Sequence, residues 1–489
     1  MRSQPANVRT QTSRGRFQQP WLLPALLVAV LVAALAVRVR LASLDPWPTV
    51  DGVHYLELAR QLVTTGRLSF SCFPPGWPLL IGVPLLFLDK SDPLALLRAA
   101  QAANVACGVA LPLLGFRMLR PDLGRWAAFA GAVVLAFLPL NIILSKVDYS
   151  EMSYTCGLVA AWLAYRSRRW LTTGLLFGFT YLIRPEALLA GVGLLLFEAV
   201  VERRWRWRAI AGLAAFVVPY LIYIRVAGGA WGISSKDVAL TLSLEAHPGW
   251  SYAGLVAGNA GRLAPMLVGL LGAPLVALAV VGMVARRGRW LLMLAPFLPV
   301  PFIINPMDVR FWQPYVPFFL LAAGLGIGAL AERAARAAPA GRQRAAVVLL
   351  AVAAIGGAGA AALDDIPWIA YNAEATYGLK DAGIWLRDRV DAETIIADYK
   401  PYTAFWAGCR FVKIPDEDNA AAIVSWARNR GAQYLIVNVH VVRTLAPGLD
   451  PLLQRPLPAH LAGRLTLVQL LEYDRVEHTT AIYRIERGL

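Results

Sequence analysis

The chain has 489 residues, of which 58% are hydrophobic and only 16% are charged. A soluble globular protein carries about 25% charged residues, so this composition excludes a water-soluble fold for most of the chain and indicates a lipid bilayer as its solvent. The net charge of +16 comes from 47 Lys and Arg against 31 Asp and Glu. The arginines lie in short clusters between apolar runs, as in membrane-protein loops, and we therefore expect no nucleic-acid partner.

Eleven long apolar runs follow one another along most of the chain. Their lengths fit membrane-spanning helices, and they lack the strict alternation of barrel strands. The predicted spans cover residues 21–41, 94–116, 126–144, 151–166, 170–183, 186–201, 209–225, 263–285, 290–304, 312–331 and 345–363. The sequence thus predicts an all-α polytopic membrane domain of about 11 transmembrane helices over residues 1–363.

Clusters of arginine occupy every second loop between the predicted spans. They lie at 117–125, 166–169, 203–208, 286–289 and 333–344. Lys and Arg mark the cytoplasmic loops of membrane proteins, and residues 1–19 are basic as well. Since no cleavage site follows the first run, we predict an uncleaved span with a cytoplasmic N-terminus. The expected location is the bacterial inner membrane, with an extracytoplasmic C-terminal domain.

Residues 364–489 are less apolar and predict a water-soluble α/β domain. Residues 378–390 and 418–430 show helical spacing, whereas 393–399 and 433–442 are typical of strands, the second of them buried. Residues 480–487 alternate between apolar and polar side chains, which favours an edge strand.

The loop after the first span carries the first candidate functional residue, Asp51. The following residues, 53–63, are amphipathic, which predicts a helix at the membrane surface. A carboxylate at that boundary can accept a proton from an acceptor hydroxyl. The alternative is structural, because Asp is a favoured helix N-cap.

A second group, Lys146, Asp148 and Glu151, lies at the start of the fourth span. The two carboxylates are three residues apart and would share one helical face, and Lys146 could pair with a phosphate. The alternative is a capping box, with Asp148 as the N-cap and Glu151 at the third helical position.

Two arginines lie in further loops on the same predicted side. Arg184 opens an Arg-Pro-Glu turn, where it could hold a phosphate or simply pair with Glu186. Arg310 lies among aromatic residues where the tenth span begins, and either faces a ligand or extends to the interface within an aromatic belt. No Cys or His spacing indicates a metal site, so we expect no cofactor, and a divalent metal is possible but not indicated.

Several of these motifs occur in an order that resembles a known family. The matching segments are Asp51–Arg60, Thr65–Ser69, Pro74–Leu80, Ser150–Glu151, Arg184–Glu186, Arg310–Pro317 and the C-terminal stretch from Leu379 through Val437. The chain resembles the C-type (GT-C) integral-membrane glycosyltransferase superfamily, in the branch of the protein O-mannosyltransferases and lipid A aminoarabinose transferases. That family often has two adjacent acids after the first span, whereas here Gly52 follows Asp51.

The resemblance implies an enzyme that moves a sugar, hexosyl or pentosyl, from a polyprenyl-phosphate donor to an acceptor hydroxyl on the extracytoplasmic side, with inversion. Asp51 would be the general base, alone or with an acid of the neighbouring loop. Lys146, Arg184 and Arg310 would stabilise the leaving lipid phosphate. The supporting residues would be His54, Tyr55, Arg67, Asp148, Glu151 and Glu186. The acceptor is a lipid, a glycan or a protein, and the sequence does not select among them.

Two other classes of protein are open alternatives. A polytopic transporter would show internal repeats, broken helices and ionisable residues within its spans. A non-catalytic scaffold would use the spans only to present the C-terminal domain. The gathering of acids and cations at one membrane face favours the transferase over both.

Overall fold

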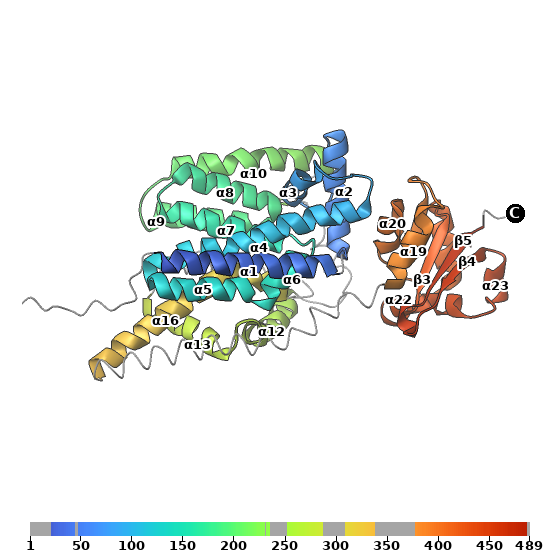
Figure 1. Cartoon of the computed structure of the whole chain (residues 1–489). Coiled ribbons are helices and arrows are strands. Elements are labelled where there is room, and N and C mark those ends of the chain that lie inside the picture. Colours follow the sequence, from blue (N-terminus) through green and yellow to red (C-terminus); the bar gives the residue numbers. More distant parts are fainter. Residues whose placement is uncertain are drawn as a thin grey trace, which may run out of the picture.

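The computed structural model describes residues 21–44, 47–229, 231–234, 252–286, 309–337 and 377–486. These residues form a helical body followed by a small C-terminal sheet domain, as the sequence predicts (Figure 1). The predicted spans over 290–304 and 345–363 lie outside the described residues.

The helical body runs largely as long, roughly parallel helices (Figure 1). Its helices are α1 (Leu22–Leu44), α2 (Val50–Thr65), α3 (Gly76–Leu85), α4 (Pro93–Leu123), α5 (Arg125–Phe137), α6 (Pro139–Lys146), α7 (Glu151–Arg166), α8 (Trp170–Ile183), α9 (Glu186–Val200), α10 (Trp207–Gly228), α12 (Tyr252–Leu271), α13 (Ala273–Arg286), the 3-10 helix η1 (Val309–Tyr315) and α16 (Val316–Ala337).

Within the described residues, four helical segments are each long and apolar enough to cross a membrane, namely α1, α4, α10 and Arg310–Arg333. Two bent helix pairs bring that number to six if each pair forms one span. The helices α7, α8 and α9 follow the predicted runs, but with 14 to 16 residues they reach only about 21–24 Å, less than the roughly 30 Å of a bilayer core.

Two of the predicted spans are broken in the structure. The run 126–144 divides into α5 and α6, which meet at an angle of 48°. The break falls at Leu138, because the residue before a proline is disfavoured in the helical conformation and Pro139 follows it. The run 263–285 divides at Gly272, whose φ of 77° lies in the left-handed region that ends a helix.

The amphipathic segment after α1 is helical, as predicted, and forms α2 across the end of the bundle (Figure 1). Tyr55, Leu56 and Ala59 are buried in the core of the helical body. Val50 and Val53 pack instead against the core of the C-terminal domain. The helix therefore lies between the two parts of the protein and contacts both.

The C-terminal domain contains a five-stranded sheet in the order β2-β1-β3-β5-β4. The strands β2, β1 and β3 are parallel to one another, and β5 pairs antiparallel with β3 and β4. Its elements are α19 (Tyr377–Arg387), β1 (Ile395–Asp398), α20 (Tyr402–Ala407), β2 (Arg410–Lys413), α21 (Ala420–Asn429), β3 (Tyr434–Asn438), α22 (Val439–Thr444), η3 (Pro447–Leu453), α23 (Ala459–Ala462), β4 (Leu465–Leu471), η4 (Val476–His478) and β5 (Thr480–Ile485).

Two expectations for this domain are wrong. The strand predicted over 433–442 ends at Asn438, because its side-chain oxygen accepts a hydrogen bond from Val441 N and caps the short helix α22. The segment 480–487 is an interior strand and not an edge strand, because β5 lies between β3 and β4. Its apolar residues Ala481, Ile482 and Tyr483 are all buried.

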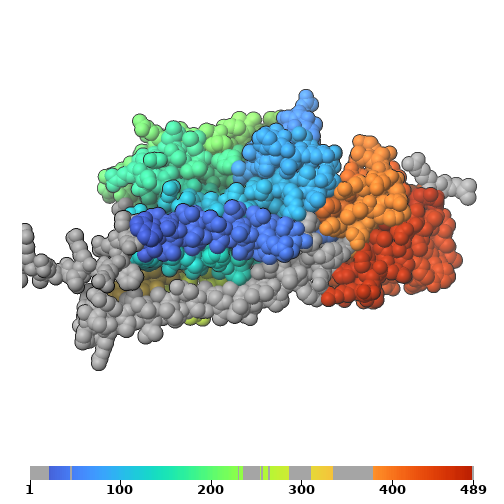
Figure 2. Space-filling view, viewed as in Figure 1, coloured from blue at the N-terminus to red at the C-terminus, as the bar shows by residue number. Residues whose placement is uncertain are grey.

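The C-terminal domain lies against the end of the helical body that carries α2 (Figure 2). The rings of Trp47 and Tyr402 meet edge to face, with their centroids 5.1 Å apart. Arg387 of α19 lies 3.8 Å from Asp92, which caps α4. These contacts place one face of the C-terminal domain against the start of α2, which carries Asp51.

Candidate active site

Asp51 lies in the first turn of α2 but does not cap the helix. The N-cap is Thr49, whose hydroxyl accepts a hydrogen bond from Gly52 N at 2.9 Å. The prediction that Asp51 caps the helix is therefore wrong, and its carboxylate does not form the capping hydrogen bond. The Asp51 side chain is 40% exposed, so a substrate can reach its carboxylate.

A chain of ion pairs connects Asp51 with residues from three other segments. Arg310 Nη2 lies 3.4 Å from Asp51 Oδ2, and Arg310 Nε lies 3.8 Å from Glu151 Oε1. The same oxygen of Glu151 accepts a hydrogen bond from Arg184 Nη1 at 2.7 Å. Arg184 Nη2 donates to Glu186 Oε1 at 2.8 Å. Five predicted residues thus form one cluster, which we call the Asp51–Arg310 cluster.

The two arginines of the cluster differ in burial. Arg184 is only 6% exposed and donates to two carboxylates, so its charge is already neutralised. Arg310 is more exposed, and its guanidinium lies over the Tyr149 ring, 4.2 Å from the centroid. Phe311 lies 5.1 Å from the Arg310 guanidinium and 5.2 Å from that of Arg184. These aromatic faces attract the cations and restrict the orientation of each guanidinium plane.

Asp148 does not cap α7, so the capping-box alternative is wrong. The helix begins at Glu151, and its N-cap residue Ser150 makes no side-chain capping bond. The Asp148 carboxylate instead accepts from Thr49 N, at 3.0 Å and 3.1 Å from its two oxygens. Asp148 thereby fixes the start of α2 and holds Asp51 in place.

The Asp148 carboxylate also lies directly beside Gly52. An ideal Cβ on Gly52 would be 1.8 Å from Asp148 Oδ2, so no larger residue fits there without displacing the acid. A second carboxyl group therefore stands next to Asp51, supplied by the neighbouring loop and not by residue 52. Burial raises the pKa of Asp148 to about 7, with a smaller contribution from the negative charge of Asp51.

Polar residues of α4 hold the loop that carries Asp148. Gln101 Nε2 donates to the Lys146 carbonyl at 2.8 Å, and Asn104 Nδ2 donates to the carbonyls of Val147 and Tyr149. Both residues are buried. Neither residue was predicted as functional from the sequence, although two amide side chains three residues apart in an apolar run are a signal for such a role.

A buried hydrogen-bond network fixes η1, which carries Arg310. Gln313 Nε2 donates to Asn141 Oδ1 at 3.1 Å, and the Thr155 hydroxyl donates to Gln313 Oε1. All three side chains are buried. The network joins η1 to α6 and α7, and therefore sets where Arg310 stands relative to Glu151.

The remaining predicted residues are Lys146, His54, Tyr55 and Arg67, which belong to α6, to α2 and to the segment after α2. Lys146 is the last residue of α6 and is half-buried in the loop that leads to Asp148. His54 stacks on Phe73 with ring centroids 5.1 Å apart, and Tyr55 contacts the same ring edge to face. Arg67 follows the far end of α2, roughly 24 Å along the helix from its start, and is not brought to the cluster.

The C-terminal domain adds a cation that the sequence analysis missed. Burial lowers the pKa of Lys400, as does the positive charge of Lys413, whereas the charges of Asp398 and Asp51 raise it. Lys400 therefore lies within electrostatic reach of Asp51. A cleft of about 450 Å³ lies between the helical body and the C-terminal domain. It is lined by residues of α2 such as His54 and by residues of the C-terminal domain such as Phe405.

The cluster combines a base with a cation that can face a substrate. A carboxylate at Asp51 can take a proton, and Arg310 can stabilise negative charge that develops within its reach. Among the described residues, no group of three or more His, Cys, Asp or Glu is arranged to hold a metal ion.

Comparisons with known proteins identify the fold. No family model and no curated protein matches the chain. The structure of ArnT from Cupriavidus metallidurans bound to undecaprenyl phosphate is similar over 94% of this chain and 98% of its own, with 13% identity and a TM-score of 0.61. The archaeal oligosaccharyltransferase AglB from Archaeoglobus fulgidus, in complex with an inhibitory peptide and a dolichol-phosphate, is similar over 86% of this chain and 70% of its own, with 14% identity and a TM-score of 0.60.

These likenesses show that the chain has the GT-C fold, as its motif order implied. The long apolar helices are those of a multi-pass membrane protein.

Proposed function

We propose that the protein is a membrane glycosyltransferase that moves a sugar from a polyprenyl phosphate to an acceptor hydroxyl. The fold likeness to ArnT, solved with undecaprenyl phosphate, supports this class of donor. The observation that carries the proposal is the contact between Asp51 and Arg310, 3.4 Å apart although 259 residues separate them in the chain.

In the proposed reaction, Asp51 accepts the proton of the acceptor hydroxyl as its oxygen attacks the anomeric carbon. The bond between that carbon and the phosphate oxygen breaks, and its electron pair stays on the lipid phosphate. Attack from the face opposite the phosphate inverts the configuration of the sugar. A positioned base of this kind contributes roughly 10²- to 10⁴-fold to a rate.

Arg310 would stabilise the charge that grows on the leaving phosphate, and Lys146 would assist from the adjacent loop. The sequence predicts that Arg184 contacts the phosphate directly. We infer instead that Arg184 positions Glu151, which in turn attracts Arg310. Arg184 pairs with both Glu151 and Glu186, which fixes the position of the Glu151 carboxylate. From that position, Glu151 lies 3.8 Å from Arg310 and attracts it.

We infer that the reaction takes place on the extracytoplasmic side of a bacterial inner membrane. The arginine-rich turns at 166–169 and 203–208 lie at the end of the bundle opposite the cluster (Figure 1). Basic loops favour the cytoplasm, so the cluster and the C-terminal domain would face outward.

The test is Asp51→Asn, with Glu57→Gln as the matched control. Glu57 lies on the same helix, is exposed, and pairs only with Arg60 among the described residues. Membranes containing each variant are supplied with radiolabelled polyprenyl-phosphate sugars, and the label transferred to envelope lipid, glycan and protein is measured. We expect Asp51→Asn to lose roughly 10²- to 10⁴-fold of the transfer and Glu57→Gln to retain it. Near-normal transfer by a folded Asp51→Asn protein would contradict the assignment of the base.

A further inference from the structure

Helix α1 carries a buried arginine, Arg38, that the proposed reaction does not use. The helix is one of the segments long and apolar enough to cross a membrane, and Arg38 is 0% exposed. Its Nε donates a hydrogen bond to the Ser145 hydroxyl at 3.0 Å, and its Nη1 donates to the Ala34 carbonyl at 3.2 Å. Its Nη2 is buried and has no hydrogen-bond partner among the described residues. Arg38 therefore links α1 to Ser145, which belongs to α6.

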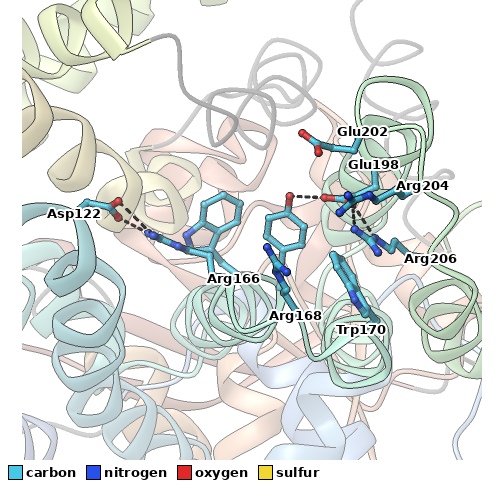
Figure 3. A pocket seen from close by; sticks show the side chains of 10 residues that line it. Asp122, Arg166, Arg168, Trp170, Glu198, Glu202, Arg204 and Arg206 are labelled. Atoms are coloured by element: carbon cyan, nitrogen blue, oxygen red, sulfur yellow. Dashed lines mark hydrogen bonds and ion pairs between the residues drawn. The ribbon is translucent and has the colours of Figure 1, made fainter.

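Other arginines of the helical body pair with carboxylates, and Arg38 differs from them. At the opposite end of the bundle, Arg166 pairs with Asp122 and Arg206 pairs with Glu198 (Figure 3). Arg38 has no carboxylate partner in the part of the chain that the structure describes. Burying a cation without an acid is unfavourable, and such a residue inside a membrane segment is therefore a candidate functional residue.

A glycine makes the space in which the Arg38 side chain lies. An ideal Cβ on Gly108 of α4 would be 2.6 Å from Arg38 Nε and 2.2 Å from Ser145 Oγ. The guanidinium can therefore reach Ser145 because residue 108 has no side chain. The Ser145 hydroxyl in turn donates to the Asn141 carbonyl, one turn earlier in α6. These contacts hold the last turn of α6 against α1 and α4.

The last turn of α6 leads directly into the loop that carries Asp148. Ser145 precedes Asp148 by three residues, and Gln101 holds the same loop from the side of α4. The Asp148 carboxylate accepts from Thr49 N at the start of α2, and Asp51 follows two residues later. A continuous series of contacts thus connects Arg38 with Asp51, and such a series can transmit a displacement from one end to the other.

We propose that Arg38 is a positioning residue of the candidate active site. By holding Ser145, it sets the place of the loop from which Asp148 fixes Asp51. The role rests on the proposed function, in which Asp51 is the base. The guanidinium is enclosed and does not contact a substrate, so Arg38 acts only through Ser145.

Replacement of Arg38 by methionine separates positioning from stability. The Ala34 carbonyl keeps its backbone hydrogen bond within α1, and the Ser145 hydroxyl keeps the Asn141 carbonyl as its acceptor. The variant therefore leaves neither of these buried groups unpaired, and it removes a buried charge. A positioning role predicts slower transfer without a loss of stability, whereas a purely structural role predicts a loss of stability.

The variants are Arg38→Met and Arg38→Lys, which keeps a cation with N–H donors. The control is Arg40→Met, which removes an exposed cation from the same helix. The melting temperature, the kcat of transfer from a radiolabelled polyprenyl-phosphate sugar, and the hydrogen exchange of the Thr49 amide are measured on the full chain in detergent.

We expect Arg38→Met to melt at the wild-type temperature or above and to lose roughly 10- to 10²-fold in kcat at an unchanged donor KM. The Thr49 amide should exchange faster, because Asp148 no longer holds it as firmly. Arg38→Lys should recover part of both losses, and Arg40→Met should match the wild type. If Arg38→Met does not fold, the same comparison is made with Gly108→Ala, whose methyl group would displace Ser145.

Wild-type kcat and wild-type exchange at Thr49 in the folded variant would overturn the proposal. A lower melting temperature with wild-type transfer per folded molecule would also overturn it, because Arg38 would then only stabilise the fold. Failure of the proposed function is distinguishable, because it appears as normal transfer by Asp51→Asn. In that case, faster exchange at Thr49 in Arg38→Met would still support the positioning of this loop by Arg38.

Discussion

The carboxylate of Asp148 occupies the space that a side chain at position 52 would need. An ideal Cβ on Gly52 would lie 1.8 Å from Asp148 Oδ2 and 2.0 Å from its Cγ. The glycine and the acid are therefore coupled, although they belong to different loops. The coupling also explains how a chain without a second acid beside Asp51 still has a second carboxyl group next to it.

The first prediction tests that coupling. Gly52→Ala should displace Asp148, break its hydrogen bonds with Thr49 N, and destabilise the protein by about 1–3 kcal/mol, as overpacking usually does. In the background of Asp148→Ala the same substitution should cost much less, because the obstructing atoms are gone. Thermal unfolding of the two single variants and the double variant measures the difference. Additive effects would show that the two positions do not compete for space.

The sequence predicted the elements that depend on local signals. Long apolar runs indicated the bundle helices, and the amphipathic pattern of 53–63 indicated α2. The breaks at Leu138 and Gly272 were missed, because the hydrophobic pattern continues through each break while Pro139 and Gly272 act on the backbone alone. The interior position of β5 was also missed, since strand order depends on tertiary pairing.

The candidate site was predictable as a set of residues but not as an arrangement. The motif order selected Asp51, Glu151, Arg184, Glu186 and Arg310, and the structure gathers all five. The sequence offered the pair between Arg184 and Glu186 as one alternative, and the structure contains it. It did not indicate that Glu151 also neutralises Arg184, or that Arg310 keeps contact with Asp51. That distinction arises from burial and from long-range packing, which linear motifs do not encode.

The second prediction separates the roles of the two arginines. Arg184→Ala would leave Glu151 and Glu186 buried without their cation, so it should destabilise the protein by roughly 3–5 kcal/mol. Arg310→Ala should lower the rate of sugar transfer by about 10²- to 10³-fold with a much smaller loss of stability, because it is more exposed. Melting temperature and transfer rate are measured for both variants. The reverse order of stability effects would refute this assignment.

The third prediction concerns pH. Since burial raises the pKa of Asp148 to about 7, the folded state keeps a proton that the unfolded state loses near pH 4. The contribution of this residue to stability should therefore fall as the pH rises from about 4 to 7, by roughly 1 kcal/mol per pH unit, and stay constant outside that range. Asp148→Asn removes the titration while its amide oxygen still accepts from Thr49 N.

The measurement for this prediction is the difference in stability between wild type and Asp148→Asn across the pH range. The difference isolates Asp148 from Asp398, whose pKa burial also raises to about 7 in the C-terminal domain. We expect the variant to gain relative stability steadily between pH 4 and 7. A difference that does not change with pH would mean that Asp148 ionises in the folded protein as readily as in the unfolded chain.

The fourth prediction concerns Gln313, which contacts neither Asp51 nor Glu151 in the ion-pair cluster but holds η1 through Asn141 and Thr155. Gln313→Leu should remove the donor that Gln313 supplies to the buried Asn141 side-chain oxygen, while the Thr155 hydroxyl keeps the Glu151 carbonyl as its acceptor. The loss of both links to η1 should shift Arg310, which lies three residues earlier in η1. A misplacement of about 1 Å costs up to roughly 10²-fold in rate, and each unpaired buried group costs about 1–3 kcal/mol. Because the proposed role of Arg310 is to stabilise the leaving phosphate, the loss should appear in kcat more than in the acceptor KM. Gln469→Leu on the edge strand β4 is the control and should change neither. Transfer at the wild-type kcat by Gln313→Leu would show that η1 is held by its apolar packing alone.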